Sequence, residues 1–311
     1  MPDVTNSLPS KKYPAPQRVI SVYQELRILL LAGLLIFSAG IAGVLYESSG
    51  DTVHMIAVTA VATISIACFV YGYIKKSPFS RERVVEKQAV FDFIILLGAL
   101  TLLTTIAYLQ FRFNFFGSRY GLATFIPMVL LFFAAYFYDH SGVLGMAITN
   151  LAAWAGIVST QRAYGILQWE MSVPLISTGF ALVVLFEVII WASEKDNFKA
   201  HFGSVFRWSA LNLAFISALT GLFNLNILVY TTLLLLFGVY FYRKAFKEKS
   251  FAQLLVTLIY IYIGCSYLFI RFLDTVSFRG MSAAYIGIFY FLLTAGLIAF
   301  ILIDHHKKLR K

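Results

Sequence analysis

The sequence predicts an all-α, polytopic integral membrane protein with about ten transmembrane helices. Three observations predict this fold class: the proportion of apolar residues, the spacing of the apolar stretches, and the distribution of charge. Of the 311 residues, 60% are hydrophobic and 13% are charged, whereas soluble domains have about 45–50% apolar and about 25% charged residues. The composition therefore excludes an ordinary soluble globule and leaves no room for a soluble catalytic domain.

Ten apolar stretches have the length of about 20 residues that a helix needs to cross a bilayer. They cover residues 28–46, 53–74, 90–111, 119–138, 141–159, 171–192, 205–223, 227–242, 251–270 and 281–303. Apolar residues occur on all sides of these stretches, which favours membrane helices over the weak alternation of barrel strands. Two connections are very short, so residues 139–141 and 223–226 must each form a whole turn.

The ten spans divide the chain into three parts. Residues 1–27 form a cytoplasmic tail with a lead-in helix, residues 28–303 form the transmembrane domain, and residues 304–311 form a cytoplasmic basic tail. The polar stretch before the first span is longer than the first region of a usual signal peptide. We therefore expect a retained first helix and no cleavable signal.

Charge predicts the orientation of the helices. With ten spans, the connections alternate between the two sides of the membrane, and 20 of the 25 Lys and Arg residues fall on the side of the termini. The remaining five are Arg112, Arg119, Arg162, Arg271 and Arg279. Because cytoplasmic loops carry the excess of positive charge, both termini are predicted to be cytoplasmic, in the inner membrane of a bacterial cell. The net charge of +10 then requires no nucleic-acid partner, and membrane lipids are the expected partners.

The outer arginines form the first candidate ligand-binding site. All five outer cations are arginine, although the chain has similar numbers of Lys and Arg, and arginine grips carboxylates and phosphates with two hydrogen bonds. Arg112 and Arg119 lie in the aromatic stretch 108–121, and Arg162, Arg271 and Arg279 lie in two further outer loops. The alternative is an aromatic belt whose arginines bind lipid phosphates or nearby carboxylates.

Two carboxylates inside or at the edge of the spans form the second candidate site. Glu187 lies about five residues before the end of the sixth span, and Asp92 begins the third. A carboxylate there is costly if it faces lipid, so either residue is a candidate proton-coupling or substrate-contacting acid. The structural alternative for Glu187 is an ion pair with Arg207 or Lys195, or a side chain that reaches the interface.

Signals for other chemistry are weak. Glu47, Asp51 and His54 have helical spacing, but intervening Ser and Gly residues interrupt the helix that would align them. The sequence has no Gly-rich phosphate loop, no nucleophile elbow and no zinc-binding motif, so no catalytic residue, cofactor or metal site is predicted. Cys68 and Cys265 lie at depths that differ too much for a disulfide and are expected to be free, inert thiols. Pro127 and Pro174 are candidate kinks.

The first half of the chain resembles a family of bacterial predicted membrane proteins. A small-residue-rich first span (residues 34–43) is followed by a short polar loop (residues 46–52). A later span ends in residues 107–110, before an aromatic loop and the stretch 126–130. Over residues 28–160 this order resembles the domain-of-unknown-function family numbered twenty-one fifty-seven. The first loop departs from that family, because Glu47 to Gly50 stand where an Asn-Trp pair is frequent. The resemblance implies a multi-pass membrane protein without an established activity.

Three functions compete at this stage. Ten spans also look like the drug/metabolite transporter class, in which two five-helix halves have opposite topology. This favours a secondary transporter or carrier for a small anionic solute or a lipid head group. The second hypothesis is a non-enzymatic scaffold or stress-related accessory protein. The third, an enzyme acting on lipid head groups, lacks a base or nucleophile on the outer face. A polar cavity that reaches the middle of the membrane would favour the first hypothesis, and a dry interior the second.

Overall fold

The fold is described from a computed structural model of the chain. Its described residues are 33, 36, 40, 43, 50–76, 78, 80, 81, 89–163, 172–276 and 281–309. The chain divides into two compact units, Met1–Ala60 and Val61–Lys311. In the first unit the four isolated residues are helical. The remainder of the predicted first span and the predicted tail, residues 1–27, lie outside the described residues.

Nine helices in the described part of the chain are long and apolar enough to cross a membrane, so the protein is an all-α, multi-pass membrane protein. They are α2 (Asp51–Lys75), α3 (Ala89–Phe113), α4 (Tyr120–Phe137), α5 (Ser141–Ala163), α6 (Ser172–Asp196), α7 (Gly203–Asn224), α8 (Ile227–Lys247), α9 (Phe251–Thr275) and α10 (Met281–Leu309). A short 3-10 helix, η1 (Ala200–Phe202), precedes α7. Each long helix coincides with one of the predicted spans from the second to the tenth, and several run past its predicted end.

The two shortest predicted turns are confirmed. Between α4 and α5, Asp139 adopts a positive φ of 55°, a conformation that Asp tolerates better than most residues. Between α7 and α8, the side chain of Asn226 accepts a hydrogen bond from the backbone N–H of Val229 at 3.1 Å. Because this side chain satisfies one of the unpaired N–H groups at the start of α8, the helix begins directly after the turn.

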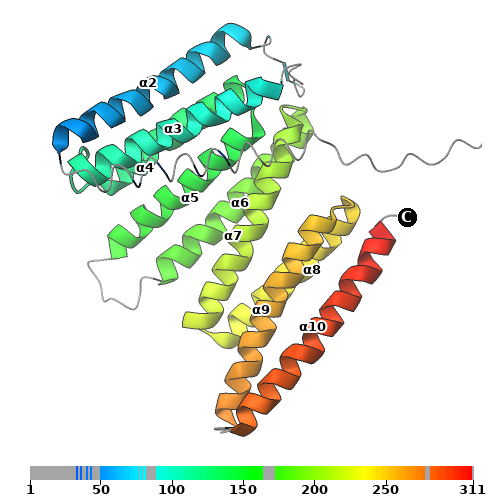
Figure 1. The fold of residues 1–311 in the computed structure, drawn as a ribbon. Helices are drawn as coiled ribbons and strands as arrows, with labels where there is room; N and C mark the ends of the chain where they lie inside the picture. The colour runs from blue at the N-terminus through cyan, green and yellow to red at the C-terminus, as the bar shows by residue number, and fades with distance from the viewer. Residues whose placement is uncertain are drawn as a thin grey trace, which may run out of the picture. The chain divides into compact units, whose positions relative to one another are not determined.

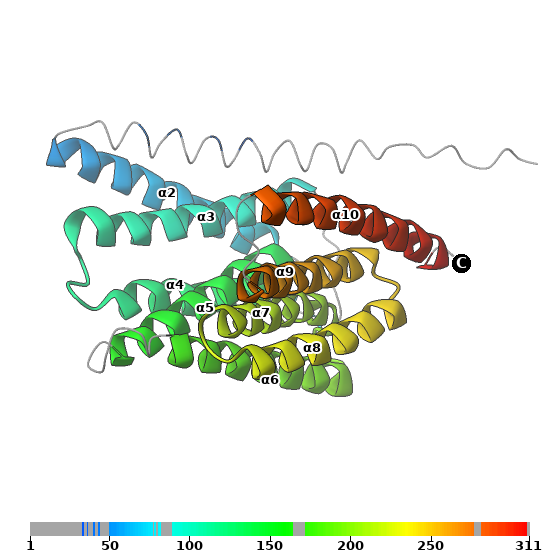
Figure 2. The same cartoon turned by 90° about the horizontal axis from the view of Figure 1, so that it is seen from below.

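The core of the second unit lies where α4, α5, α6 and α7 meet. These helices are consecutive in the chain and neighbours in space (Figures 1 and 2). Apolar side chains fill the region between them, including Leu131, Leu144, Phe186 and Phe215, each at 0% exposure. More than half of the apolar span around α7 is buried, the largest share of any described helix. Helix α7 is therefore the central element, and its neighbours are positioned by packing against it.

Small residues let the helices approach one another closely. Gly221 of α7 faces the ring of Tyr230 of α8, and a Cβ at this position would collide with three ring atoms. Pro174 lies at the third position of α6, where the missing N–H would have no partner within the helix. The kink predicted there is therefore not required by a lost hydrogen bond. Pro127 is buried inside α4, and the kink predicted at this residue stays a prediction.

The flanking helices are joined to the core by polar side chains. Tyr138 donates a hydrogen bond to the carbonyl of Phe69 in α2 at 2.8 Å, and burial raises the pKa of this phenol above its usual value of 10.0, so it remains a donor.

Helix α10 lies beside α9 (Figures 1 and 2). The Tyr262 and Thr294 hydroxyls meet at 3.3 Å, and the rings of Phe269 and Tyr290 stack at 3.9 Å. Hydroxyl and ring contacts thus join the last two helices.

The two cysteines are free, as expected from their depths. Cys68 is buried in α2 and Cys265 is exposed on α9. No disulfide therefore links these two helices.

Candidate functional site

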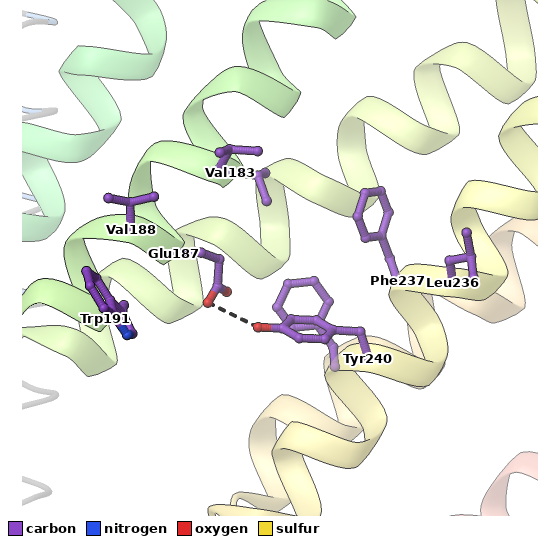
Figure 3. A pocket seen from close by; sticks show the side chains of 9 residues that line it. Val183, Glu187, Val188, Trp191, Leu236, Phe237 and Tyr240 are labelled. Carbon is purple, nitrogen blue, oxygen red and sulfur yellow. Dashed lines mark hydrogen bonds between the residues drawn. The ribbon is translucent and has the colours of Figure 1, made fainter. Parts of the chain in front are cut away.

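A groove of about 540 Å³ lies between α6 and α8. Its lining residues are Val183, Val184, Glu187, Val188 and Trp191 from α6, and Leu236, Phe237, Tyr240 and Phe241 from α8. Figure 3 shows the two helices as opposite walls, with Glu187 and Tyr240 turned toward one another. The volume lies within the range of about 300–1,000 Å³ that is typical of ligand pockets.

Helical spacing aligns the apolar wall of α6. Val184, Val188 and Trp191 are three or four residues apart, so their side chains project from one face of the helix. All three are more than half exposed on the surface of the protein. In a membrane-spanning helix, such exposure is to lipid. The groove therefore opens sideways into the bilayer.

Helix α7 holds the two walls in place. Both α6 and α8 pack against it, through ring contacts of Phe186 with Phe206 at 5.6 Å and of Phe215 with Phe241 at 5.8 Å. The walls also meet directly, because the ring of Phe180 contacts that of Phe237 at 5.7 Å. Since Phe180 precedes the lining residues of α6, this contact limits the groove at the end away from Trp191.

A three-residue polar cluster occupies the groove wall near Trp191. The ammonium of Lys244 donates to both carboxylate oxygens of Glu187, at 3.0 and 2.8 Å, and to the phenol oxygen of Tyr240 at 3.0 Å. The Tyr240 hydroxyl in turn donates to Glu187 at 3.1 Å. The Glu187 side chain is 27% exposed and that of Lys244 is 16% exposed. The carboxylate is thus paired with a cation of the opposite helix, α8.

The long side chain of Lys244 explains how the two charges meet. Lys244 lies three residues before the end of α8, whereas Glu187 lies nine residues before the end of α6. At about 1.5 Å per residue, Glu187 is therefore the deeper group. A lysine near a helix end normally extends toward water, but here its ammonium is directed to the Glu187 carboxylate. The sequence-based alternatives for the partner, Arg207 and Lys195, are both wrong.

Those two cations have other contacts. Arg207 of α7 pairs with Glu194 of α6 at 2.9 Å and with Glu248, directly after α8, at 2.8 Å. The ammonium of Lys195 lies 5.1 Å from the centre of the Trp191 ring, within the range of a cation–π interaction. Ionic contacts therefore join α6, α7 and α8 at the same end of the groove.

A second, more deeply buried ion cluster lies at the start of η1. One carboxylate oxygen of Asp139 is 2.8 Å from the Lys199 ammonium and 2.9 Å from Nε2 of His201. The Lys199 side chain is only 1% exposed, and its backbone N–H donates to the carbonyl of Arg81 at 2.8 Å. This cluster joins the α4–α5 turn to the α6–α7 connection. Its burial and its contacts between two connections indicate a structural role.

The other predicted acid, Asp92, does not line the groove. It is half-buried in α3. Nε2 of His140 lies 3.0 Å from its backbone carbonyl, and Nδ1 of the same ring accepts from the N–H of Val143. The ring therefore donates from Nε2 and is neutral. A role of the Asp92 carboxylate in proton coupling stays a prediction.

The predicted outer arginines also lie outside the groove. Arg112 and Arg119 are exposed at the α3–α4 connection, and Arg271 is exposed on α9, 6.0 Å from the centre of the Tyr267 ring. The side chain of Arg162 and the whole of Arg279 lie outside the described residues. The outer arginine site stays a prediction.

The α3–α4 connection is ordered by Gln110. The side chain of Gln110 accepts a hydrogen bond from the backbone N–H of Phe116 and donates one to the carbonyl of Gly117.

Sequence reasoning missed Tyr240, Lys244 and the Asp139 cluster. Tyr240 and Lys244 are four residues apart on α8 and therefore share one face, which was the available signal for their pairing. No comparable signal existed for Lys199, which is 60 residues from Asp139 in the sequence (199 minus 139).

The groove is chemically suited to an amphiphilic molecule. Its surface is almost entirely apolar, and its polar atoms belong to the charged cluster near Trp191. Among the residues that the structure describes, no group of three or more His, Cys, Asp or Glu side chains is arranged to hold a metal ion. The arrangement can therefore contact an apolar chain along the walls and an anion or cation at the cluster.

Comparison of the chain with family models, with curated proteins and with solved structures gives no match. The resemblance carried by residues 28–160 therefore stays a prediction, and the groove is the feature of the protein that bears on its function.

Proposed function

We propose that the protein is a carrier for an anionic amphiphile, which it binds in the groove between α6 and α8. The observation that supports this proposal is the polarity of the groove: a lipid-facing apolar wall ends at Glu187, the lining acid to which the Lys244 ammonium donates at 2.8 Å. A chain in contact with Val184 and Val188 would bring its head group to the level of this lysine.

The distribution of positive charge supports an orientation for this carrier. In the inner membrane of a bacterial cell, with both termini cytoplasmic, the Lys244 end of the groove faces the cytoplasm. Trp191 lies at the same end, and tryptophan is enriched at membrane interfaces. The head group of an amphiphile from the inner leaflet would thus be at the depth of the cluster.

Reconstitution into liposomes tests the proposal. We expect the full-length chain to accelerate transfer of fluorescent phosphatidylglycerol between leaflets, and Val188→Trp to reduce this transfer because the larger side chain fills the groove. The matched control is Val129→Trp on α4, since Val129 is similarly exposed but does not line the groove. Equal transfer by both variants would contradict a role of the groove.

The dense packing of the core favours a second candidate function. The space between α4 and α7 is filled by apolar side chains, and the groove lies on the lipid side of α6 and α8 instead of running through the centre of the core. A non-enzymatic scaffold requires such a rigid interior and no transport path. Absence of lipid transfer by the wild-type protein, with normal folding, would favour the scaffold.

A further inference from the structure

We propose that a cavity between α5, α6 and α7 binds a small, uncharged alcohol, whose hydroxyl group forms a hydrogen bond with Ser217. The cavity has a volume of about 130 Å³ and lies where these three neighbouring helices meet (Figures 1 and 2). On α6 its lining residues lie between Leu175 and Leu182, whereas the groove begins at Val183. The two sites are therefore separate, and the inference does not depend on the proposed function.

The hydroxyl group of Ser217 is the polar group of this cavity that needs a partner. Ser217 lines the cavity and is only 6% exposed. Other polar side chains of α7 donate to the carbonyl four residues earlier, as Asn212 does to Trp208 and Thr220 to Ile216. The Ser217 hydroxyl forms no hydrogen bond of this kind, and none with any other residue that the structure describes. Buried side-chain oxygens are as a rule hydrogen-bonded, so a ligand is the expected partner.

The Ser217 oxygen lies against the backbone of α6. A Cβ at Gly179 would overlap this oxygen, so the oxygen occupies the space that the missing side chain leaves. The contact does not satisfy the hydroxyl group, because a Cα–H group is a weak donor. A buried hydroxyl without a partner is costly in an apolar environment. A molecule that forms a hydrogen bond with Ser217 removes this cost.

The other lining residues define the chemical class of the ligand. Thr178 and Thr220 also line the cavity. Their hydroxyls donate to the carbonyls of Pro174 at 2.7 Å and Ile216 at 2.8 Å, which leaves them only as acceptors for a ligand. The remaining lining residues are apolar, and none of the described residues that line the cavity is charged. The site therefore favours a neutral molecule with a hydroxyl group on an apolar body.

The volume limits the size of this molecule. An apolar cavity of about 150 Å³ in another protein holds one benzene molecule. The cavity beside Ser217 therefore suits a molecule of about five or six non-hydrogen atoms. Water fits by size, but each water molecule needs about two to four polar partners, and most of this lining is apolar. Butanol satisfies both parts of the site, because its hydroxyl group can meet Ser217 while its carbon chain contacts the apolar side chains.

The ligand reaches the cavity from the bilayer. Two lining residues, Leu175 and Ile216, are 43% and 50% exposed, so the cavity opens toward lipid. Ser217 lies seven residues (224 minus 217) before the end of α7, which is about 10 Å along the helix axis. A ligand must therefore dissolve in the membrane before it binds, as small alcohols do.

Photolabelling tests the inference. The full-length protein in phosphatidylcholine liposomes is irradiated with a butanol derivative that carries a diazirine, and mass spectrometry locates the adducts. We expect saturable labelling of segments 175–182 and 213–220, and competition by unlabelled butanol. Pentane has the same number of non-hydrogen atoms as butanol but no hydroxyl group. At equal concentration in the bilayer, pentane should compete about two- to tenfold less well, the range expected for one hydrogen bond.

Variants separate the hydroxyl group from the cavity. Ser217→Ala keeps the cavity and removes the hydroxyl, so butanol and pentane should compete equally well. Ser209→Ala is its control and should keep the preference for butanol, because the Ser209 hydroxyl donates to the Val205 carbonyl at 3.0 Å and does not line the cavity. Ala152→Leu fills the cavity and should abolish saturable labelling. Ala153→Leu adds the same side chain at the next, exposed residue and should leave the labelling unchanged.

The outcomes decide different parts of the inference. Equal competition by butanol and pentane in the wild type, or a preference for butanol that persists in Ser217→Ala, would overturn the hydrogen bond with Ser217. Absence of saturable labelling in the two segments would overturn the alcohol site itself. The wild-type comparisons decide both points even if a variant fails to fold. None of these results bears on lipid transfer through the groove between α6 and α8.

Discussion

At the scale of single residues, the described ionic contacts differ in burial, and burial decides what they do. The Asp139–Lys199 pair is almost completely enclosed, whereas the Glu194 side chain of the Arg207 pair is 57% exposed. An enclosed charge without its partner has no water to compensate it. The first pair therefore contributes to the stability of the fold, and the second contributes little.

This difference can be measured by substitution. Asp139→Asn keeps a residue that tolerates the positive φ at this position, but it removes the negative charge that lies 2.8 Å from the buried Lys199 ammonium. We expect the free energy of unfolding in mixed micelles to fall by about 3–5 kcal/mol. Glu194→Gln serves as the comparison and should change it by about 0–1 kcal/mol. A similar small effect of both substitutions would show that Lys199 is not held by charge.

The partner of Glu187 shows where sequence reasoning stops at this scale. The depth of Glu187 in an apolar span predicts that it has a partner, because the cost of an isolated carboxylate there is a local property. Which cation provides it depends on how α6 and α8 are arranged around α7. Lys244 is 57 residues away, while the cations expected to pair with Glu187 were nearer in the sequence.

At the scale of elements, the contact between α7 and α8 depends on a residue without a side chain. Gly221 is buried against the Tyr230 ring, and the turn that joins the two helices begins a few residues later. A methyl group at this position must displace a rigid ring. At a helical glycine with open space around it, the same methyl group stabilises the fold, because it reduces the entropy of the unfolded chain.

Alanine substitutions at two glycines should therefore have opposite signs. Gly221→Ala should lower the free energy of unfolding by about 1–3 kcal/mol through overpacking. Gly145→Ala in α5, where the nearest atom to an added Cβ is 3.9 Å away, should raise it by up to about 1 kcal/mol. Both values come from denaturant titrations in micelles. Tyr230→Leu in the Gly221→Ala background should restore part of the loss, and failure to do so would contradict a collision with the ring.

The helices themselves were predictable because their cause is local. Apolar length and flanking charge specify each span, and α2 to α10 coincide with predicted stretches. Helix ends were less predictable, since α8 and α9 continue through residues that hydropathy assigned to connections. Backbone hydrogen bonds continue a helix into the interface even where its side chains are polar, as at Lys244 and Lys247.

At the scale of the whole molecule, the orientation of the helices connects the charge pattern to the groove. If the positive-inside distribution sets the topology, the α3–α4 connection and the α8–α9 connection lie on opposite sides of the membrane. The Lys244 cluster then faces the cytoplasm.

Cysteine labelling in cells tests this orientation. With Cys68 and Cys265 replaced by alanine, a single cysteine at Ser118 should react with a reagent that cannot cross the inner membrane. A single cysteine at Lys249 should react only after the cells are opened. Both residues are exposed, so burial does not prevent labelling. Labelling of Lys249→Cys in intact cells would contradict the ten-span topology.

The consecutive order of the core helices has a consequence for biosynthesis. The dense packing of α4 to α7 is complete in sequence at Asn224, and 23 residues (247 minus 224) then lead to the end of α8. At a synthesis rate of about 5–20 residues per second, the ribosome needs roughly 1–5 s to deliver them. We therefore expect α6, the first wall of the groove, to pack on α7 before α8 is complete. Helix α8 would then complete the groove on a surface that formed before its arrival.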